Sequence, residues 1–180
     1  MPDHLQLFDW QQGIQKELQN YKNNQYYAKL WIGSQKQELQ FIFDTGSPWF
    51  WAPTVDCLLC HEADKFDTSL SATFVNTSTA LSTVHYGAGS VYGYRSKDKI
   101  CVESSTDDFA CTQNLQMLAV TRTSMLDGMQ ADGIVGLAPV SNTAEDQSGG
   151  TSIIQALYDE HKINQRVFSF KLAGTTDYGQ

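Results

Sequence analysis

The chain has 180 residues, of which 41% are hydrophobic and 18% charged, and its formal net charge is −8. This composition is typical of one globular domain and excludes a disordered chain. The acidic balance argues against a nucleic-acid binder, which needs a basic face. The sequence has no apolar run of about 18 residues or more and therefore predicts no membrane span. Its first 20 residues also lack the basic start and apolar stretch of a signal peptide.

The N-terminal segment has a weak helical pattern. Leu5, Phe8, Ile14 and Leu18 recur at roughly helical spacing between polar residues, although Gly13 interrupts the pattern. The spacing predicts an amphipathic helix over residues 5–20.

From Tyr26 onward the pattern changes to short runs of β-forming residues separated by Gly, Ser and Asn. The runs that we expect to form strands are 26–32, 38–43, 81–86, 90–94, 99–102, 115–120, 134–135 and 167–172. One helix is predicted among them, with Thr151 or Ser152 as N-cap and Ile153, Ile154 and Leu157 on one face. The pattern predicts an all-β domain with one clear helix.

Asp44-Thr45-Gly46-Ser47 places a carboxylate directly after an apolar strand. Gly46 permits a sharp turn there, and a carboxylate held on such a turn can act as a general base on water. Taken alone, however, the motif fits equally an ordinary turn aspartate that bonds its own backbone.

Two further motifs follow along the chain. Tyr86-Gly87-Ala88-Gly89-Ser90 lies between two strand-like runs and predicts a hairpin with a glycine-rich tip. Asp132-Gly133-Ile134-Val135-Gly136-Leu137 is an apolar strand with glycines, which indicates that another backbone passes closely.

Four cysteines form two locally spaced pairs, Cys57 with Cys60 and Cys101 with Cys111. They suit two disulfides in an oxidising compartment. Two alternatives are open for the first pair, because Cys57-x-x-Cys60-His61 is also the attachment motif of c-type haem and could contribute zinc ligands.

The three motifs in this order, with Trp51 also in place, resemble the N-terminal lobe of the pepsin-like aspartic peptidases. The resemblance implies a pepsin-like acid-protease lobe over residues 23–180, preceded by a propeptide-like extension over residues 1–22. In such a precursor Lys16 or Lys22 could pair with Asp44. The family also has a small disulfide loop where Cys57 and Cys60 lie. The family needs no metal or organic cofactor, and the resemblance implies a secreted, lysosomal or vacuolar protein.

For the first motif, the resemblance implies the catalytic roles. Asp44 would be one of two catalytic aspartates, and Ser47 would bond its outer oxygen. Gly46 would form the turn, and Thr45 would brace two lobes beneath the pair of aspartates. In this mechanism the two aspartates share one proton and activate a water molecule.

For the other motifs, the resemblance implies contacts with a polypeptide substrate. Tyr86 would close over the substrate as the flap tyrosine, with the Trp51 indole donating to its hydroxyl. Gly87 and Ser90 would contact the substrate backbone, and Ile134 would form an apolar wall beside the scissile bond. Without the resemblance, Tyr86 and Trp51 would be interpreted as core aromatics, and Asp132 lies outside the cleft in the family pattern.

No second Asp-Thr-Gly or Asp-Ser-Gly motif follows Asp44, so the sequence predicts half an active site. The second aspartate would come from a second lobe of a two-lobed enzyme or from a second copy of this chain. A non-catalytic peptide-binding lobe is the main alternative, and a redox or haem protein built on Cys57 and Cys60 is a more distant one.

Overall fold

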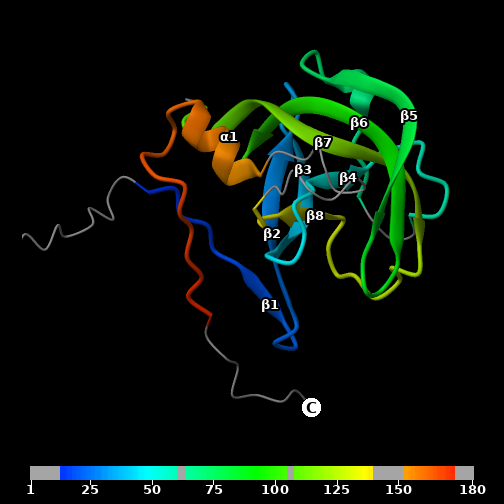
Figure 1. The fold of residues 1–180 in the computed structure, drawn as a ribbon, viewed down its shortest axis with the longest axis horizontal. Coiled ribbons are helices and arrows are strands. Elements are labelled where there is room, and N and C mark those ends of the chain that lie inside the picture. Colours follow the sequence, from blue (N-terminus) through cyan, green and yellow to red (C-terminus); the bar gives the residue numbers. More distant parts are fainter. Residues whose placement is uncertain (1–12, 61–63, 105–107, 140–151, 173–180) are drawn as a thin grey trace, which may run out of the picture.

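The computed structural model describes residues 13–60, 64–104, 108–139 and 152–172, shown in colour in Figure 1. Eight strands, a short 3-10 helix and one α-helix form the described part. The strands are β1 (Gln19–Tyr21), β2 (Gln25–Ile32), β3 (Gln37–Asp44), β4 (Trp51–Pro53), β5 (Val75–His85), β6 (Ser90–Cys101), β7 (Cys111–Ser124) and β8 (Gly133–Gly136), and the helices are η2 (Thr68–Leu70) and α1 (Ile153–Asp159).

The strands form one sheet that closes on itself. Their order is β1-β2-β3-β8-β4-β7-β6-β5, and β2 also pairs with β6, so that the six strands from β2 to β6 in this order make a closed ring. β3 pairs with β8 in parallel and β4 with β7 in parallel, whereas the other pairs are antiparallel. β1 and β5 are therefore the strands outside the ring.

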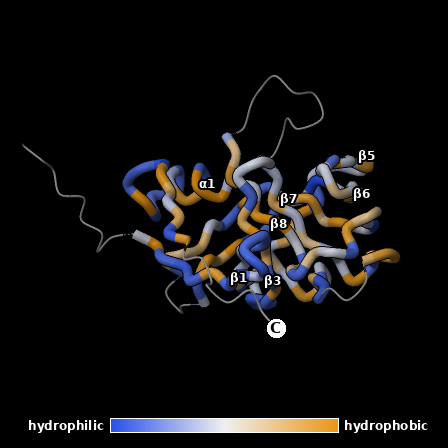
Figure 2. Tube along the Cα trace, turned by 90° about the horizontal axis from the view of Figure 1, so that it is seen from below, coloured by the Kyte–Doolittle hydropathy of each residue, from blue (hydrophilic) through white to orange (hydrophobic). Residues whose placement is uncertain are grey.

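The interior of this ring is filled by apolar side chains from nearly every strand, among them Leu30, Phe41 and Leu115. α1 packs its buried Ile153 and Leu157 into the same cluster. The helix lies at the opposite end of the molecule from the β5–β6 hairpin, as both views show (Figures 1 and 2).

The predicted all-β fold with one helix is confirmed. The Ser152 hydroxyl accepts a hydrogen bond from Ile154 N and caps α1, as its sequence indicated. No helix among the described residues has the length and apolar character needed to cross a membrane.

The helix predicted over residues 5–20 is wrong in its described part. Residues 13–18 have no helical structure, and Gln19–Tyr21 forms β1, which pairs with β2. The edge of β2 offers backbone hydrogen bonds that a short helix interrupted by Gly13 cannot match. Residues 1–12 lie outside the described part.

The late strand predicted over residues 167–172 is also wrong. The segment has no strand structure, and the side chains of Val167, Phe168, Phe170 and Leu172 are all exposed. Among the described residues no strand pairs with it, and an alternating pattern forms a strand only when a partner completes its hydrogen bonds.

Two predicted strands, 90–94 and 99–102, belong to one continuous strand, β6. The polar residues between them suggested a break. Instead, Asp98 is fully buried and accepts hydrogen bonds from the hydroxyls of Ser71 (3.0 Å) and Thr73 (2.5 Å). The partners come from a distant segment, so the sequence pattern of β6 alone does not reveal them.

Candidate active site

The Asp44 turn begins where β3 ends beside β8. Asp44 pairs with Gly136 in the parallel register, and Leu137 N donates to the Asp44 carbonyl at 2.8 Å. A Cβ on Gly136 would lie 2.4 Å from the backbone of both Pro48 and Trp49. Only glycine therefore lets the turn pass across β8, as the glycines of this motif indicated.

The Asp44 carboxylate is fixed by two donors from its own turn. Oδ1 accepts from Gly46 N at 2.8 Å, and Oδ2 accepts from Ser47 Oγ at 2.6 Å. Asp44 itself is half-buried, whereas Ser47 is only 4% exposed. The two donors therefore fix the orientation of both carboxylate oxygens.

The tip between β5 and β6 is a tight turn. Tyr86 N donates to the Gly89 carbonyl at 2.8 Å, and Gly89 N donates back to Tyr86 at 3.2 Å. A Cβ on Gly89 would lie 2.1 Å from the Ser124 carbonyl, so the base of this turn packs closely against the end of β7. Gly87, in contrast, is exposed.

The Tyr86 side chain turns back from this tip toward the barrel. Its hydroxyl accepts a hydrogen bond from Trp51 Nε1 at 2.9 Å. Burial raises the pKa of the Tyr86 phenol well above its usual value of 10.0, although contacts with Ser47 and Trp51 act in the opposite direction. Tyr86 therefore remains a neutral hydroxyl close to the Asp44 turn.

A cleft of about 450 Å³ lies between the Asp44 turn and the β5–β6 tip. It is lined by Ile42, Asp44, Gly46, Ser47, His85, Tyr86, Gly87, Ala88, Leu126, Met129 and Ile134. The volume suits a small part of a larger ligand, such as one or two side chains and the backbone between them. One carboxylate, several apolar walls and a neutral phenol thus meet in one concave site.

A model of the eukaryotic aspartyl protease family matches residues 25–180. Pepsin A from Sus scrofa is 36% identical over 165 residues, which cover 90% of this chain and 41% of that protein. Chymosin from Callithrix jacchus is 34% identical over 84% of the chain and 39% of its own length. For cathepsin D from Chionodraco hamatus the identity is 30%, over 89% of the chain and 40% of that protein.

The chain belongs to the eukaryotic aspartyl protease family. It spans about two fifths of the length of the curated relatives that it matches.

The structure brings most of the predicted site residues to the cleft, with three exceptions. Thr45 is exposed and Trp51 is buried behind Tyr86, and neither lines the cleft. Ser90 does not line it either, and its hydroxyl lies 2.9 Å from His85 Nδ1.

Sequence reasoning missed several residues that line the cleft. Ile42 could have been found, because it lies two residues before Asp44 and so shares its face of β3. His85 and Ala88 adjoin or belong to the hairpin motif. Leu126 and Met129, however, come from the connection between β7 and β8, and only the fold brings that segment to the cleft.

Asp132 does not line the cleft. It is 8% exposed, and its two oxygens accept from Gln40 N at 2.7 Å and Asp64 N at 2.8 Å. Burial raises its pKa above the usual 3.8, although both backbone donors favour the charged form. Asp132 therefore lies outside the cleft, where the resemblance to the family placed it.

Both predicted disulfides, Cys57–Cys60 and Cys101–Cys111, are present. With its sulfurs paired, the first offers no thiolate to zinc and no thiol to haem. His61 lies outside the described residues.

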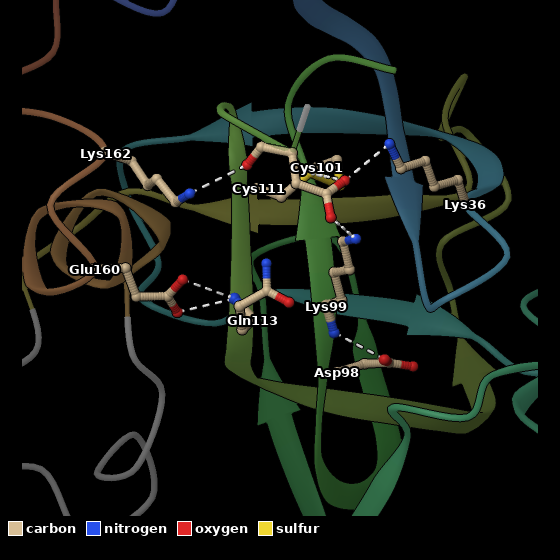
Figure 3. Close-up of a disulfide and its surroundings, with 9 residues drawn as sticks. Lys36, Asp98, Lys99, Cys101, Cys111, Gln113, Glu160 and Lys162 are labelled. Atoms are coloured by element: carbon tan, nitrogen blue, oxygen red, sulfur yellow. Dashed lines mark hydrogen bonds and ion pairs between the residues drawn. A yellow bond between two sulfur atoms is a disulfide. The ribbon is translucent and has the colours of Figure 1, made fainter. Parts of the chain in front are cut away.

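The second disulfide links register partners on β6 and β7, as the close-up shows (Figure 3). Asp108 lies beside it and forms ion pairs with Lys99 and Lys36. Hydrogen bonds from Lys99 first and then Lys36 hold the pKa of Asp108 below its usual 3.8.

The N-terminal lysines do not contact Asp44 in this structure. The Lys16 ammonium lies 4.4 Å from the centre of the Trp31 ring, and that of Lys22 lies 4.9 Å from the Tyr21 ring. The suggested pairing of either lysine with Asp44 is therefore absent here.

Proposed function

We propose that this chain supplies one half of the active site of an aspartic endopeptidase, with Asp44 as one of two catalytic aspartates. The observation that carries the proposal is the Asp44 carboxylate, held by Gly46 and Ser47 at the floor of a cleft under Tyr86. Two carboxylates that share one proton can hold a water molecule between them. One then acts as base while the other protonates the carbonyl oxygen of the peptide bond.

The substrate is an extended polypeptide with apolar residues near the cut. Ile42 and Ile134 give the cleft an apolar wall, and Gly87 offers an exposed backbone at the β5–β6 tip. A peptide added beside this hairpin would gain affinity from backbone hydrogen bonds and preference from the pockets. Tyr86 stays neutral and can close over the peptide.

The second aspartate comes from a second lobe or from a second copy of this chain. The exposed Thr45 next to Asp44 is available to pack against that second half. The chain spans about two fifths of the length of each of these curated relatives, which supports a second lobe. A non-catalytic peptide-binding lobe is the alternative, favoured by the presence of only one Asp-Thr-Gly motif.

We place the protein in an oxidising compartment, secreted or lysosomal to vacuolar, because it holds two disulfides. The proposed reaction uses carboxylates and water and needs neither a metal nor an organic cofactor.

The test is cleavage of a denatured protein at about pH 4, where a pair of coupled aspartates can share one proton. The 180-residue chain is compared with Asp44→Asn and with Asp56→Asn, a control at an exposed aspartate that does not line the cleft. We expect the Asp56→Asn variant to behave as the parent does.

Cleavage by the parent that is lost only in Asp44→Asn would show that two copies complete the site. Size-exclusion chromatography of the active fraction then checks for a dimer. If the parent is inactive, binding of a labelled apolar peptide is measured by fluorescence anisotropy. Binding that requires the cleft would favour the peptide-binding alternative. If the parent shows no cleavage and no binding, both proposals are contradicted for the isolated chain.

A further inference from the structure

A second hollow, distinct from the active-site cleft, lies on the β5–β6–β7 sheet. Its volume is about 580 Å³, and it is lined by Thr77, Ser78, Ala80, Ser82, Arg95, Lys97 and Gln116. None of these residues lines the cleft around Asp44. Arg95 is five residues along β6 from Ser90, which places it roughly 17 Å from the flap end of the strand.

The hollow arises from an irregularity in strand pairing. Asn76 pairs with Ser96 and Leu81 pairs with Tyr94, so that residues 77–80 of β5 lie opposite Arg95 alone. This bulge moves the edge strand away from β6 and opens space above the sheet. Such bulges commonly redirect side chains at functional positions.

Arg95 is held in place from two sides. Its Nε donates to Ser82 Oγ at 3.2 Å, and its guanidinium carbon lies 5.5 Å from the centre of the Trp49 ring. Trp49 is 1% exposed and therefore forms a fixed platform for the guanidinium. An arginine ordered in this way loses little conformational freedom when its remaining N–H groups bind a ligand.

The lining of the hollow is positively charged, whereas the protein as a whole is negatively charged. The chain has a net charge of −8, yet strands β5, β6 and β7 contain Arg95, Lys97, Lys99 and Arg122. Their single acidic residue is Asp98, which is fully buried. In the part of the chain that the structure describes, no carboxylate lines the hollow.

Neutral donors complete the lining. Thr77, which carries a hydroxyl, and Gln116, which carries an amide, line the hollow, and Lys97 and Gln116 are direct partners across β6 and β7. The Ser82 oxygen accepts from Arg95, which leaves its own proton free to donate. Donors from three strands thus surround one space, which suits an anion with three or four oxygens better than a carboxylate with two.

We propose that this hollow binds a tetrahedral oxyanion, a phosphate or sulfate group, with Arg95 and Lys97 as the charged ligands. The group can be a free ion or a monoester on a polypeptide, since both present the same oxygens. The proposal does not depend on Asp44.

The experiment is isothermal titration calorimetry of the 180-residue chain at low ionic strength. Four probes are compared: sodium phosphate, sodium sulfate, a short peptide with one phosphoserine, and the same peptide with Glu in its place. We expect the phosphate, the sulfate and the phosphoserine peptide to bind, with the Glu peptide weaker by roughly tenfold or more. A phosphoserine peptide tighter than free phosphate identifies the monoester as the source, and equal affinity identifies the free ion.

Single substitutions distinguish specific binding in the hollow from general electrostatic attraction to the sheet. Arg95→Gln and Lys97→Gln should each weaken phosphate binding by roughly tenfold. Arg122→Gln is the matched control, because it removes the same charge from the same sheet where Arg122 stacks on Tyr92 instead of lining the hollow. It should change the affinity by less than about twofold. Arg95→Lys keeps the charge without the planar fork and should bind with intermediate affinity.

Circular dichroism checks that each variant is folded. If Arg95→Gln does not fold, the result for Lys97→Gln tests the proposal, since Lys97 is not packed on Trp49. Equal losses in all three charge variants, or a Glu peptide that binds as well as the phosphoserine peptide, would overturn the assignment. Absence of binding by the parent would do the same. Asp44→Asn should bind phosphate as the parent does, so failure of the proposed protease function leaves this result unaffected.

Discussion

Asp132 and Asp44 lie near opposite ends of the same parallel strand pair, β3 and β8, yet their environments differ. At the first end, Asp132 is buried and both of its oxygens accept from backbone N–H groups, those of Gln40 and Asp64. These donors come from two separate segments, so the carboxylate ties β8 to β3 and to the connection that follows β4. A buried carboxylate that accepts from two separate segments in this way stabilises the fold.

At the other end, Asp44 accepts only from its own turn, from Gly46 and Ser47, and remains half-buried at the cleft. Its donors orient the carboxylate without joining distant segments. The comparison separates two uses of one side chain. Burial with backbone donors from distant segments gives stability, and orientation by local donors at an open cleft leaves the group available for chemistry.

Gly136→Ala should give the largest effect, because it breaks the close crossing that supports Asp44. The added Cβ would lie 2.4 Å from backbone atoms of Pro48 and Trp49, which cannot move aside as a flexible side chain can. We expect a loss of about 3 kcal/mol in the free energy of unfolding, measured with urea. Gly128→Ala is the control, since its Cβ would meet nothing within 4 Å. Similar losses in the two variants would show that the crossing is not tight.

Asp132→Asn should destabilise the protein by about 2 kcal/mol, because the amide can satisfy only one of the two backbone donors and turns an NH₂ toward the other. Asp44→Asn should cost less than about 1 kcal/mol, because Asp44 is only half-buried and Gly46, one of its two donors, is exposed. Thermal unfolding of the two variants measures the difference. Equal losses would contradict the distinction between a structural and an available aspartate.

Ser47→Ala should have an intermediate effect at the Asp44 end. It removes the 2.6 Å hydrogen bond to Asp44 Oδ2 and leaves that oxygen without its donor. We expect a loss of about 1 kcal/mol in unfolding free energy. Ser90→Ala, at a hydroxyl whose contact is the exposed His85, should change stability by less than about 0.5 kcal/mol. A larger loss for Ser90 than for Ser47 would contradict the support that Ser47 gives to the Asp44 turn.

The sequence predicted the parts of the fold that depend on local order. The alternation around Phe41 and Phe43 leads into β3 and the Asp44 turn, and the Ser152 cap begins α1 where expected. The glycines at 133 and 136 correctly indicated a close backbone crossing. Each of these features can be read from a few neighbouring residues.

The failures depend on distant partners. Residues 13–20 have a helical pattern, but β2 provides an edge that turns part of them into β1. The 167–172 segment alternates like a strand without a partner among the described residues. In the cleft, Leu126 and Met129 carry no motif and become part of the site only when the sheet closes. Local chemistry was thus predictable, whereas the choice of partner was not.

The smallest expected effect is a difference in pH dependence between two aspartates outside the cleft. Burial raises the pKa of Asp132 above 3.8, so the stability linked to its proton is present below that pH and is lost as the pH rises through the folded-state value. Lys99 and Lys36 lower the pKa of Asp108, so its contribution is present above pH 3.8 and is lost as the pH falls below it. Urea unfolding of the parent, Asp132→Asn and Asp108→Asn from acid to neutral pH measures both. As the pH rises, the unfolding free energy of the parent should fall relative to that of Asp132→Asn. Over the same range it should rise relative to that of Asp108→Asn. Two differences with the same sign of slope would mean that burial does not govern Asp132, and that its two backbone donors outweigh the loss of water.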